Sequence, residues 1–141
     1  MATNLIIIGI ASYLIGSIPF AYIFVKLNLK KDITSEGSGN VGAMNSFEVT
    51  GKKWIGIAVA ISDALKGTVS VLLISMIDNY SYPAICVASL SSLIGHNYSV
   101  FLKFKGGRGL ATAAGALLVI NPIVFVMWCL LWVLAIYTIK I

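Results

Sequence analysis

The chain has 141 residues, of which 59% are hydrophobic and 11% are charged, and its formal net charge is +5. Soluble domains contain about 25% charged residues, so this composition excludes an ordinary soluble protein and predicts a single integral membrane domain over residues 1–141. The cations lie in short segments between apolar runs, which fits membrane topology and excludes a nucleic-acid partner. Cys86 and Cys129 fall inside apolar runs, where we expect buried thiols and no disulfide.

Apolar runs follow one another along the chain, and each is a candidate membrane-spanning helix, which needs about 20 mostly apolar residues. They cover residues 5–25, 54–77, 82–102, 110–120 and 123–139. The segment Gly16-Ser17-Ile18-Pro19 interrupts the first run, and Asn121-Pro122 separates the last two, because proline cannot continue a helix without losing a hydrogen bond. The sequence therefore predicts an all-α fold, a polytopic transmembrane helix bundle of about five spans.

Lysine and arginine residues predict the orientation of these spans. Residues 26–53 contain five lysines and residues 103–108 contain three cations, whereas residues 78–81 contain none. Because short cytoplasmic loops are enriched in lysine and arginine, we expect the first and third connections in the cytoplasm and the N-terminus outside. If the last two runs are separate spans, Lys140 also lies in the cytoplasm, as the charge rule favours; a single kinked helix would place it outside.

Both cationic connections are rich in glycine. The first has glycines interleaved with neutral hydrogen-bond donors: Gly37, Ser38, Gly39, Asn40, Gly42 and Asn45. The second has cations around a glycine pair: Lys103, Lys105, Gly106, Gly107 and Arg108. Glycines allow the backbone to turn its N–H groups towards a ligand, and cations beside such a backbone suit phosphate oxygens. These loops predict a phosphate site; the alternative is two flexible loops whose lysines only set the topology.

Three ionisable residues lie within or beside the apolar runs. Asp63 and Lys66 are three residues apart and share one face of a helix. A lone charge at the bilayer centre costs about 2.5–3.5 kcal/mol, so we expect an interior pair that either locks helix packing or supports the phosphate loops. His96 precedes the second loop and is a candidate base, phosphate donor or hydrogen-bonding residue. No cluster of histidines or cysteines predicts a metal site, and nothing in the spacing connects Asp63 with His96.

The two loops resemble the motifs of a known enzyme family. The pattern GSGN-x-GA-x-N at residues 37–45 and the pattern GH-x4-F-x2-FKGG-x-G at residues 95–109 resemble the bacterial membrane glycerol-3-phosphate acyltransferases that use acyl phosphate as donor. Residues 16–20 (GSIPF) and 63–67 (D-x2-KG) also resemble that family. Four matches in the same order are specific, whereas a single glycine-rich loop is not.

The resemblance implies a multi-pass enzyme of the bacterial inner membrane with its motif loops in the cytoplasm. The implied reaction transfers a fatty acyl group from acyl phosphate to the 1-hydroxyl of glycerol 3-phosphate, giving lysophosphatidic acid and phosphate for phospholipid synthesis. The implied partners are these two substrates, membrane lipids and an enzyme that produces acyl phosphate, with no cofactor and no metal. Ser38, His96 and Lys105 are expected to be catalytic, and Asp63 and Lys66 to support them. The loops are expected to bind substrate through Gly37, Gly39, Asn40, Gly42, Asn45, Gly106, Gly107, Arg108 and Gly109.

The chain departs from the family pattern at a few positions. Met44 stands where threonine is usual, Glu48 where a basic residue is usual, Ser99 where proline is usual and Arg108 where lysine is usual. The family has seven spans, and its last two spans and a third motif with His and Asn are absent, so we expect a C-terminally truncated member. The alternatives are a non-catalytic lipid- or phosphate-binding membrane protein of the same fold and a small organic-phosphate transporter.

Overall fold

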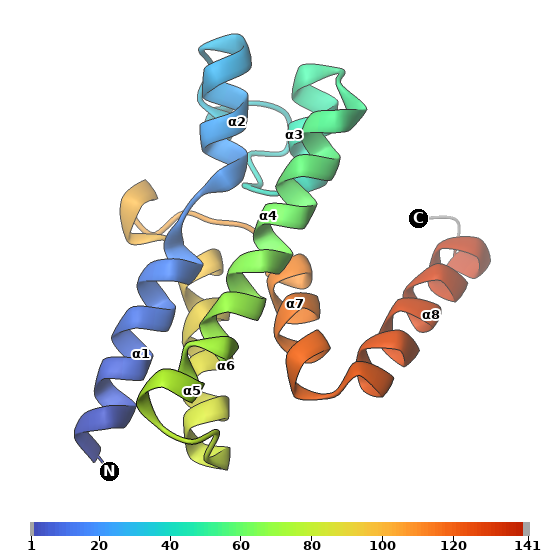
Figure 1. The fold of residues 1–141 in the computed structure, drawn as a ribbon. Coiled ribbons are helices and arrows are strands. Elements are labelled where there is room, and N and C mark those ends of the chain that lie inside the picture. The colour runs from blue at the N-terminus through green and yellow to red at the C-terminus, as the bar shows by residue number, and fades with distance from the viewer. Residues whose placement is uncertain (1, 140–141) are drawn as a thin grey trace.

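The computed structural model describes residues 2–139, which form an all-helical bundle (Figure 1). The predicted all-α class is confirmed: within this range the only pairing of β type is an isolated bridge between Ser99 and Lys105. The α-helices are α1 (Ala2–Ser17), α2 (Phe20–Leu29), α3 (Ala43–Thr50), α4 (Lys53–Leu72), α5 (Ile74–Ile77), α6 (Tyr82–Asn97), α7 (Leu110–Ile120) and α8 (Pro122–Ile139), and the short 3-10 helices are η1 (Ile33–Ser35) and η2 (Val100–Leu102).

Helices α1 and α2 form one column that is broken near its middle (Figure 1). Pro19 follows the end of α1 and has no N–H group, so the ladder of helical hydrogen bonds stops there. Phe20 N instead donates to the nearby carbonyl of Ile18 at 3.2 Å. The predicted interruption is confirmed, and it leaves carbonyl oxygens at Ser17 and Ile18 that accept hydrogen bonds from other segments.

Small residues allow the helices to approach one another closely. A Cβ atom at Gly16 of α1 would collide with the backbone of Ser92 in α6, and a Cβ at Gly95 would collide with the backbone of α1. The pair α4 and α7 is built in the same way, because a Cβ at Gly67 would meet the carbonyl of Thr112. Such contacts between small residues are characteristic of helices that pack inside membranes.

The buried side chains form two apolar clusters with a polar layer between them. One cluster lies among α2, α3 and the first half of α4, and it contains Val25 and Val59. The other lies among α1, the second half of α4, α5 and α6, and it contains Val71. Between Val59 and Val71, α4 contributes the buried Asp63 and Lys66. The layer of polar side chains is therefore at the same height as the break in the α1–α2 column.

The predicted count of five spans is not confirmed. Only two segments of the described chain are long and apolar enough to cross a membrane, Asn4–Leu29 and Lys53–Leu72, and Leu110–Ile120 and Pro122–Ala135 are shorter apolar helices. The third predicted run, residues 82–102, is also corrected. It divides into α6 and η2, because Tyr98 leaves the helical conformation with φ −130° and ψ 66°.

The first polar connection contains a helix that the sequence did not predict, α3, which packs on α4. The predicted boundary at Asn121-Pro122 is confirmed, and Asn121 Oδ1 caps α8 by accepting hydrogen bonds from the N–H groups of Ile123 and Val124 at 3.1 and 3.2 Å. Beyond this boundary α8 leans away from the bundle (Figure 1). Lys140, on which the predicted side of the C-terminus depends, lies outside the described residues.

Candidate functional site

The first loop, residues 36–42, is organised around the buried side chain of Asn45. Its Nδ2 donates to the carbonyls of Glu36 at 3.1 Å and Asn40 at 2.9 Å. Its Oδ1 accepts a hydrogen bond from Ser38 N at 3.0 Å. One amide thus satisfies three backbone groups of the loop, and its donors and acceptor are engaged inside the protein. Sequence analysis assigned Asn45 to substrate binding, whereas this geometry makes it the residue that shapes the loop.

Glycines place Ser38 at the exposed crest of the first loop. Gly37 and Gly39 have φ values of +56° and +70°, a left-handed conformation that residues with a Cβ rarely adopt. A Cβ at Gly37 would also collide with the Asn45 side chain that holds the loop. The Ser38 side chain between them is exposed, so its hydroxyl is accessible to a ligand.

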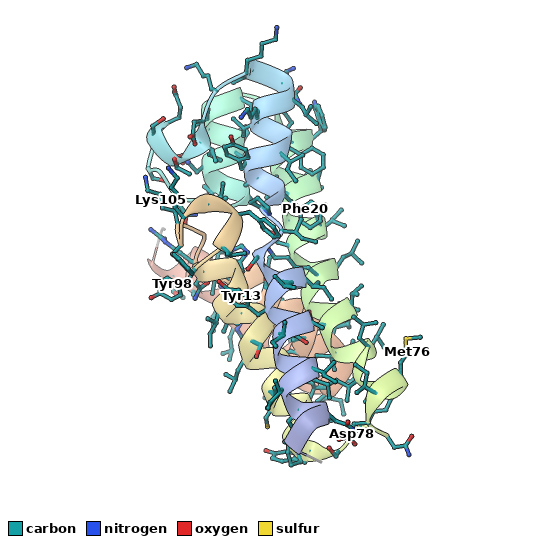
Figure 2. The ribbon with its side chains drawn as sticks, turned by 90° about the vertical axis from the view of Figure 1, so that its left-hand side faces the viewer. Tyr13, Phe20, Met76, Asp78, Tyr98 and Lys105 are labelled. Carbon is teal, nitrogen blue, oxygen red and sulfur yellow. The ribbon has the colours of Figure 1, made fainter. Side chains whose placement is uncertain are left out.

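The second loop, residues 98–109, begins with a tight turn that exposes its cations. Phe104 N donates to Ser99 O at 2.8 Å, and Ser99 N donates to Lys105 O at 3.3 Å. Lys103 and Phe104 both have left-handed φ values, 55° and 63°, although neither is glycine. Such positions store backbone strain and persist only where the surroundings fix them. Lys103, Lys105 and Arg108 are all exposed, and Figure 2 shows Lys105 at the edge of the molecule.

Lys105 also faces a carboxylate that precedes the first loop. Asp32 caps η1, and its Oδ1 accepts a hydrogen bond from Thr34 N at 2.9 Å. This hydrogen bond is the main cause of a lowered pKa of Asp32, and the positive charge of Lys105 contributes to the same shift. The side chain of Lys105 is therefore close to the segment that leads into the first loop.

The two loops are joined by backbone contacts. Val41 N donates to Gly106 O at 3.3 Å, and Gly107 N donates to the carbonyl of His96 at 3.1 Å. A Cβ at Gly107 would lie 2.6 Å from the carbonyl oxygen of Val41, so the second loop packs against the first at this point. A Cβ at Gly106 would collide with the carbonyls of His96 and Asn97. The glycine pair is required by close packing as well as by any ligand.

Each loop leads directly into the N-terminus of a helix. Gly42 is the N-cap of α3 and Gly109, with φ +76°, is the N-cap of α7. Neither helix has an acidic residue in its first turn. The first N–H groups of a helix have no partner within the helix and carry the positive end of its dipole, which favours a bound anion.

A buried ionic cluster lies beneath the second loop. Lys66 Nζ is 2.9 Å from Asp63 Oδ1, and the same ammonium donates to the carbonyl of Ile18 at 3.0 Å. His96 Nδ1 is 3.6 Å from Asp63 Oδ1, which is longer than a hydrogen bond but close enough for an electrostatic contact. All three side chains are at most 6% exposed. The association of Asp63 with Lys66 was expected, whereas that of Asp63 with His96 was not.

A small cavity lies between this cluster and the break between α1 and α2. Its volume is about 10 Å³, and its walls include Ser17, Phe20, Lys66 and Leu102. That is about the space needed by one water molecule. The exposed cations Lys105 and Arg108 are on the solvent side of the second loop, which is where we expect a phosphate ligand.

The hydroxyl of Ser99 is a functional group that sequence analysis missed. It donates to the carbonyl of Ser17 at 2.5 Å and so connects the second loop to the break. On the same side, Tyr13 of α1 donates its hydroxyl to the carbonyl of Tyr98 at 2.9 Å (Figure 2). Pro19 was the available signal, because a proline break leaves carbonyls that need donors from elsewhere.

The described residues also show whether a metal ion could be bound and where Glu48 lies. No group of three or more His, Cys, Asp or Glu side chains that could hold a metal ion is present in the part of the chain that the structure describes. Glu48, at the position where a basic residue was expected, lies exposed on α3. Its carboxylate is therefore accessible from the same solvent as the first loop.

Comparisons with a family model and with known proteins point to the same family. The family model described as Glycerol-3-phosphate acyltransferase matches residues 6–141. The glycerol-3-phosphate acyltransferase of Pelagibacter ubique (strain HTCC1062) is 43% identical over 128 residues, which make up 90% of this chain and 64% of that protein. Glycerol-3-phosphate acyltransferase 2 of Bacillus anthracis is 48% identical over 114 residues, 81% of this chain and 58% of the relative. The chain spans about three-fifths of the length of these relatives.

Solved structures with a similar fold agree with this result. The crystal structure of PlsY (YgiH), an integral membrane glycerol 3-phosphate acyltransferase, in its glycerol 3-phosphate form matches with a TM-score of 0.84 and 36% identity, covering 94% of this chain and 66% of that chain. The lysophosphatidic acid form matches with a TM-score of 0.78 and 37% identity, covering 91% and 62% of the two chains.

Proposed function

The chain belongs to the glycerol-3-phosphate acyltransferase family, and from this premise we propose that its two loops bind glycerol 3-phosphate for acylation in phospholipid synthesis. The acyl donor is acyl phosphate, and the products are lysophosphatidic acid and phosphate. The protein lies in a membrane, as do the PlsY structures with which it shares its fold. The donor and the activity are proposals for this chain, which matches about three-fifths of its relatives' length.

The observation that carries this proposal is the joining of the two loops at Val41 and Gly106. This contact combines two helix N-termini, a set of backbone N–H groups and the exposed cations Lys105 and Arg108 on one side of the molecule. A phosphate dianion needs such a concentration of donors and positive charge. We place the glycerol moiety of the substrate beside the hydroxyl of Ser38, which is exposed.

The chemistry requires little from an acid or base of the protein. The 1-hydroxyl oxygen attacks the carbonyl carbon of acyl phosphate, an ester bond forms, the bond from that carbon to the phosphate oxygen breaks, and phosphate leaves with the proton. Since phosphate is already a good leaving group, positioning and electrostatic stabilisation supply most of the acceleration. We assign Lys105 to neutralising the developing charge and Ser38 to orienting the hydroxyl.

We further propose that the protein is a multi-pass protein of the bacterial inner membrane and that both loops face the cytoplasm. The lysine and arginine distribution supports this orientation. Figure 2 shows Met76 and Asp78, at the turn without cations, near the lower end of the molecule and well below Lys105. Cysteines introduced at the exposed positions Ser38 and Lys103 should resist an impermeant thiol reagent in intact cells, and efficient labelling of either would exclude this topology.

Binding of glycerol 3-phosphate by the purified chain in detergent or nanodiscs tests the phosphate site. Lys105→Ala should weaken binding about ten- to a hundredfold, the effect of one lost charge-assisted contact. Lys103→Ala is the matched control, because it removes the same charge from the same exposed loop, and it should have a smaller effect. Equal losses in the two variants, or no loss in either, would overturn the phosphate-site assignment. Acyl transfer from acyl phosphate by the same preparations then tests the reaction.

A second candidate function is phosphate or lipid binding without catalysis, and Glu48 favours it. Glu48 lies exposed on α3 where the family resemblance leads us to expect a cation, so one positive charge that the reaction is expected to use is replaced by a carboxylate. In that case glycerol 3-phosphate would bind weakly and acyl transfer would be undetectable even at saturating substrate. The two assays described above distinguish this function from the enzymatic one.

A further inference from the structure

We propose that His96 is a positioning residue that, together with Asp63 and Lys66, holds the second loop in its ligand-binding shape from below. Sequence analysis assigned His96 to catalysis, and the structure points to a different role. The inference deepens the proposed function, since the loop that it concerns is the proposed phosphate site. The contact between His96 and Gly107 does not depend on which ligand the loop binds.

The first step is that both the backbone and the ring of His96 contact Gly107. Gly107 N donates to the carbonyl of His96 at 3.1 Å. The ring lies directly under the same residue, because a Cβ at Gly107 would collide with His96 Nε2. The histidine side chain is only 6% exposed. A ring covered in this way supports the loop, and it cannot contact a substrate bound on the loop's outer side.

The second step is that the opposite edge of the ring faces the ionic pair of α4. His96 Nδ1 faces Asp63 Oδ1 at 3.6 Å, and Asp63 is held by Lys66 at 2.9 Å. Lys66 is fixed in turn by its hydrogen bond to the carbonyl of Ile18. The ring therefore lies between the carboxylate of Asp63 and Gly107, and its position depends on packing and on the electrostatic contact rather than on a hydrogen bond of Nδ1. The opposite charges of Asp63 and Lys66 offset one another, which allows both to be buried.

The third step is that the loop is held at both of its ends. Near its beginning, Ser99 Oγ donates to the carbonyl of Ser17 at 2.5 Å, and towards its end Gly107 is bonded to His96. Between these points Gly106 O accepts from Val41 N, which transmits the position of the second loop to the first. Displacement of the His96 ring should therefore loosen Gly107 and Val41 together, while distant helical amides are unaffected.

Amide hydrogen exchange measured by NMR in detergent micelles tests this arrangement. In Asp63→Asn and His96→Ala, the amides of Gly107 and Val41 should exchange about five- to tenfold faster than in the wild type. The backbone hydrogen bond from Gly107 N to the carbonyl of His96 is retained in both variants, but the loop that it holds loses the support of the ring and opens more often. The amide of Leu73, which donates to Val69 O within α4 at 3.0 Å, should be unchanged. Equal acceleration at Leu73 would indicate general destabilisation and overturn the specific role.

Thr68→Val is the matched control variant. It lies on the same helix as Asp63 and removes one hydrogen bond between helices, from Thr68 Oγ1 to Gly115 O at 2.9 Å. It contacts neither loop, so Gly107 and Val41 should exchange as in the wild type. If Asp63→Asn fails to fold because it leaves Lys66 unpaired, the double variant Asp63→Asn with Lys66→Met removes both charges and takes its place.

Rescue by His96→Gln separates positioning from acid–base catalysis. The longer glutamine side chain can place an amide nitrogen beneath Gly107, where Nε2 lies in the wild type, and it does not titrate. Relative to His96→Ala, this variant should restore slow exchange at Gly107 and most of the affinity for glycerol 3-phosphate. Failure of His96→Gln to restore either property would overturn the positioning role.

The exchange data and the binding data can fail separately. If the wild type does not bind glycerol 3-phosphate but the variants accelerate exchange at Gly107, the positioning inference holds and the proposed function fails. If the wild type binds glycerol 3-phosphate and exchange at Gly107 is the same in all variants, the proposed function holds and the positioning inference fails.

Discussion

Lys66, in the middle of α4, donates a hydrogen bond of 3.0 Å to the carbonyl of Ile18 at the break between α1 and α2. The break exists because Pro19 cannot continue the helix, and the Ile18 carbonyl, which accepts a hydrogen bond from Phe20 N at 3.2 Å, accepts a second one from another segment. A lysine inside an apolar helix would be costly alone, and Asp63 offsets its charge at 2.9 Å. Each feature would be unfavourable alone: a proline interrupts one span, and a charge pair is buried in another. Together they stabilise the fold, because the buried lysine donates a hydrogen bond to a carbonyl at the proline break.

Replacement of Lys66 alone should therefore be much more damaging than replacement of the pair. Lys66→Met leaves Asp63 as an unpaired buried charge and removes the donor to Ile18, so the free energy of unfolding should fall by about 3–5 kcal/mol. The double variant Asp63→Asn with Lys66→Met should recover a large part of this loss. Unfolding followed by circular dichroism in detergent measures the free energy of unfolding of both variants. A double variant as unstable as Lys66→Met would mean that the lost hydrogen bond, rather than the unpaired charge, dominates.

Features set by a single local rule could be predicted from the sequence. The break at Pro19, the boundary at Asn121-Pro122 and the extent of α7 all follow from the conformational limits of proline and from apolar run length. The sequence predicted that the two glycine-rich loops lie on the same side of the bundle, but not that they contact each other. Their direct contact between Val41 and Gly106 needed the structure.

Features that depend on tertiary contacts could not be predicted. The residues of α3 are mixed in polarity, and this helix is stabilised by packing on α4, where a Cβ at Gly56 would lie 3.0 Å from Phe47 Cβ. The end of α6 was missed because apolar residues continue beyond Asn97 into η2. The proximity of Asp63 and His96 joins two helices whose spacing along the chain contains no information about it.

The small residues between α4 and α7 give a second prediction. Gly115→Ala should lower the free energy of unfolding by at least 1–3 kcal/mol, roughly the cost of overpacking, because its Cβ would collide with the backbone of Ala64. Gly51→Ala is the control. Gly51 has φ +67° but no neighbour within 4 Å, so its substitution should cost about 1 kcal/mol from backbone conformation alone. Thermal unfolding of both variants makes the comparison, and a larger loss for Gly51→Ala would contradict the close packing.

Asn45 provides a third prediction, concerning the shape of the first loop. Asn45→Asp retains the acceptor for Ser38 N but loses the donors to the carbonyls of Glu36 and Asn40. Stability should fall by about 1–3 kcal/mol, and affinity for glycerol 3-phosphate should fall as the loop loosens. Ser38→Ala is the control, since it leaves the hydrogen bonds of Asn45 intact and should leave stability unchanged. If Asn45→Asp weakens binding without any loss of stability, Asn45 contacts the ligand directly.

The last prediction concerns the carboxylate of Glu48 on α3. If it repels the substrate phosphate, Glu48→Arg should tighten binding of glycerol 3-phosphate about tenfold, a change of about 1–2 kcal/mol for one reversed charge contact. The control is Asp78→Arg, which changes the net charge by the same amount near the lower end of the molecule, well away from Lys105 (Figure 2). Screening over that distance should leave its affinity close to that of the wild type. Equal tightening in both variants would show that the effect comes from net charge, and unchanged affinity in Glu48→Arg would show that this side chain points away from the bound phosphate.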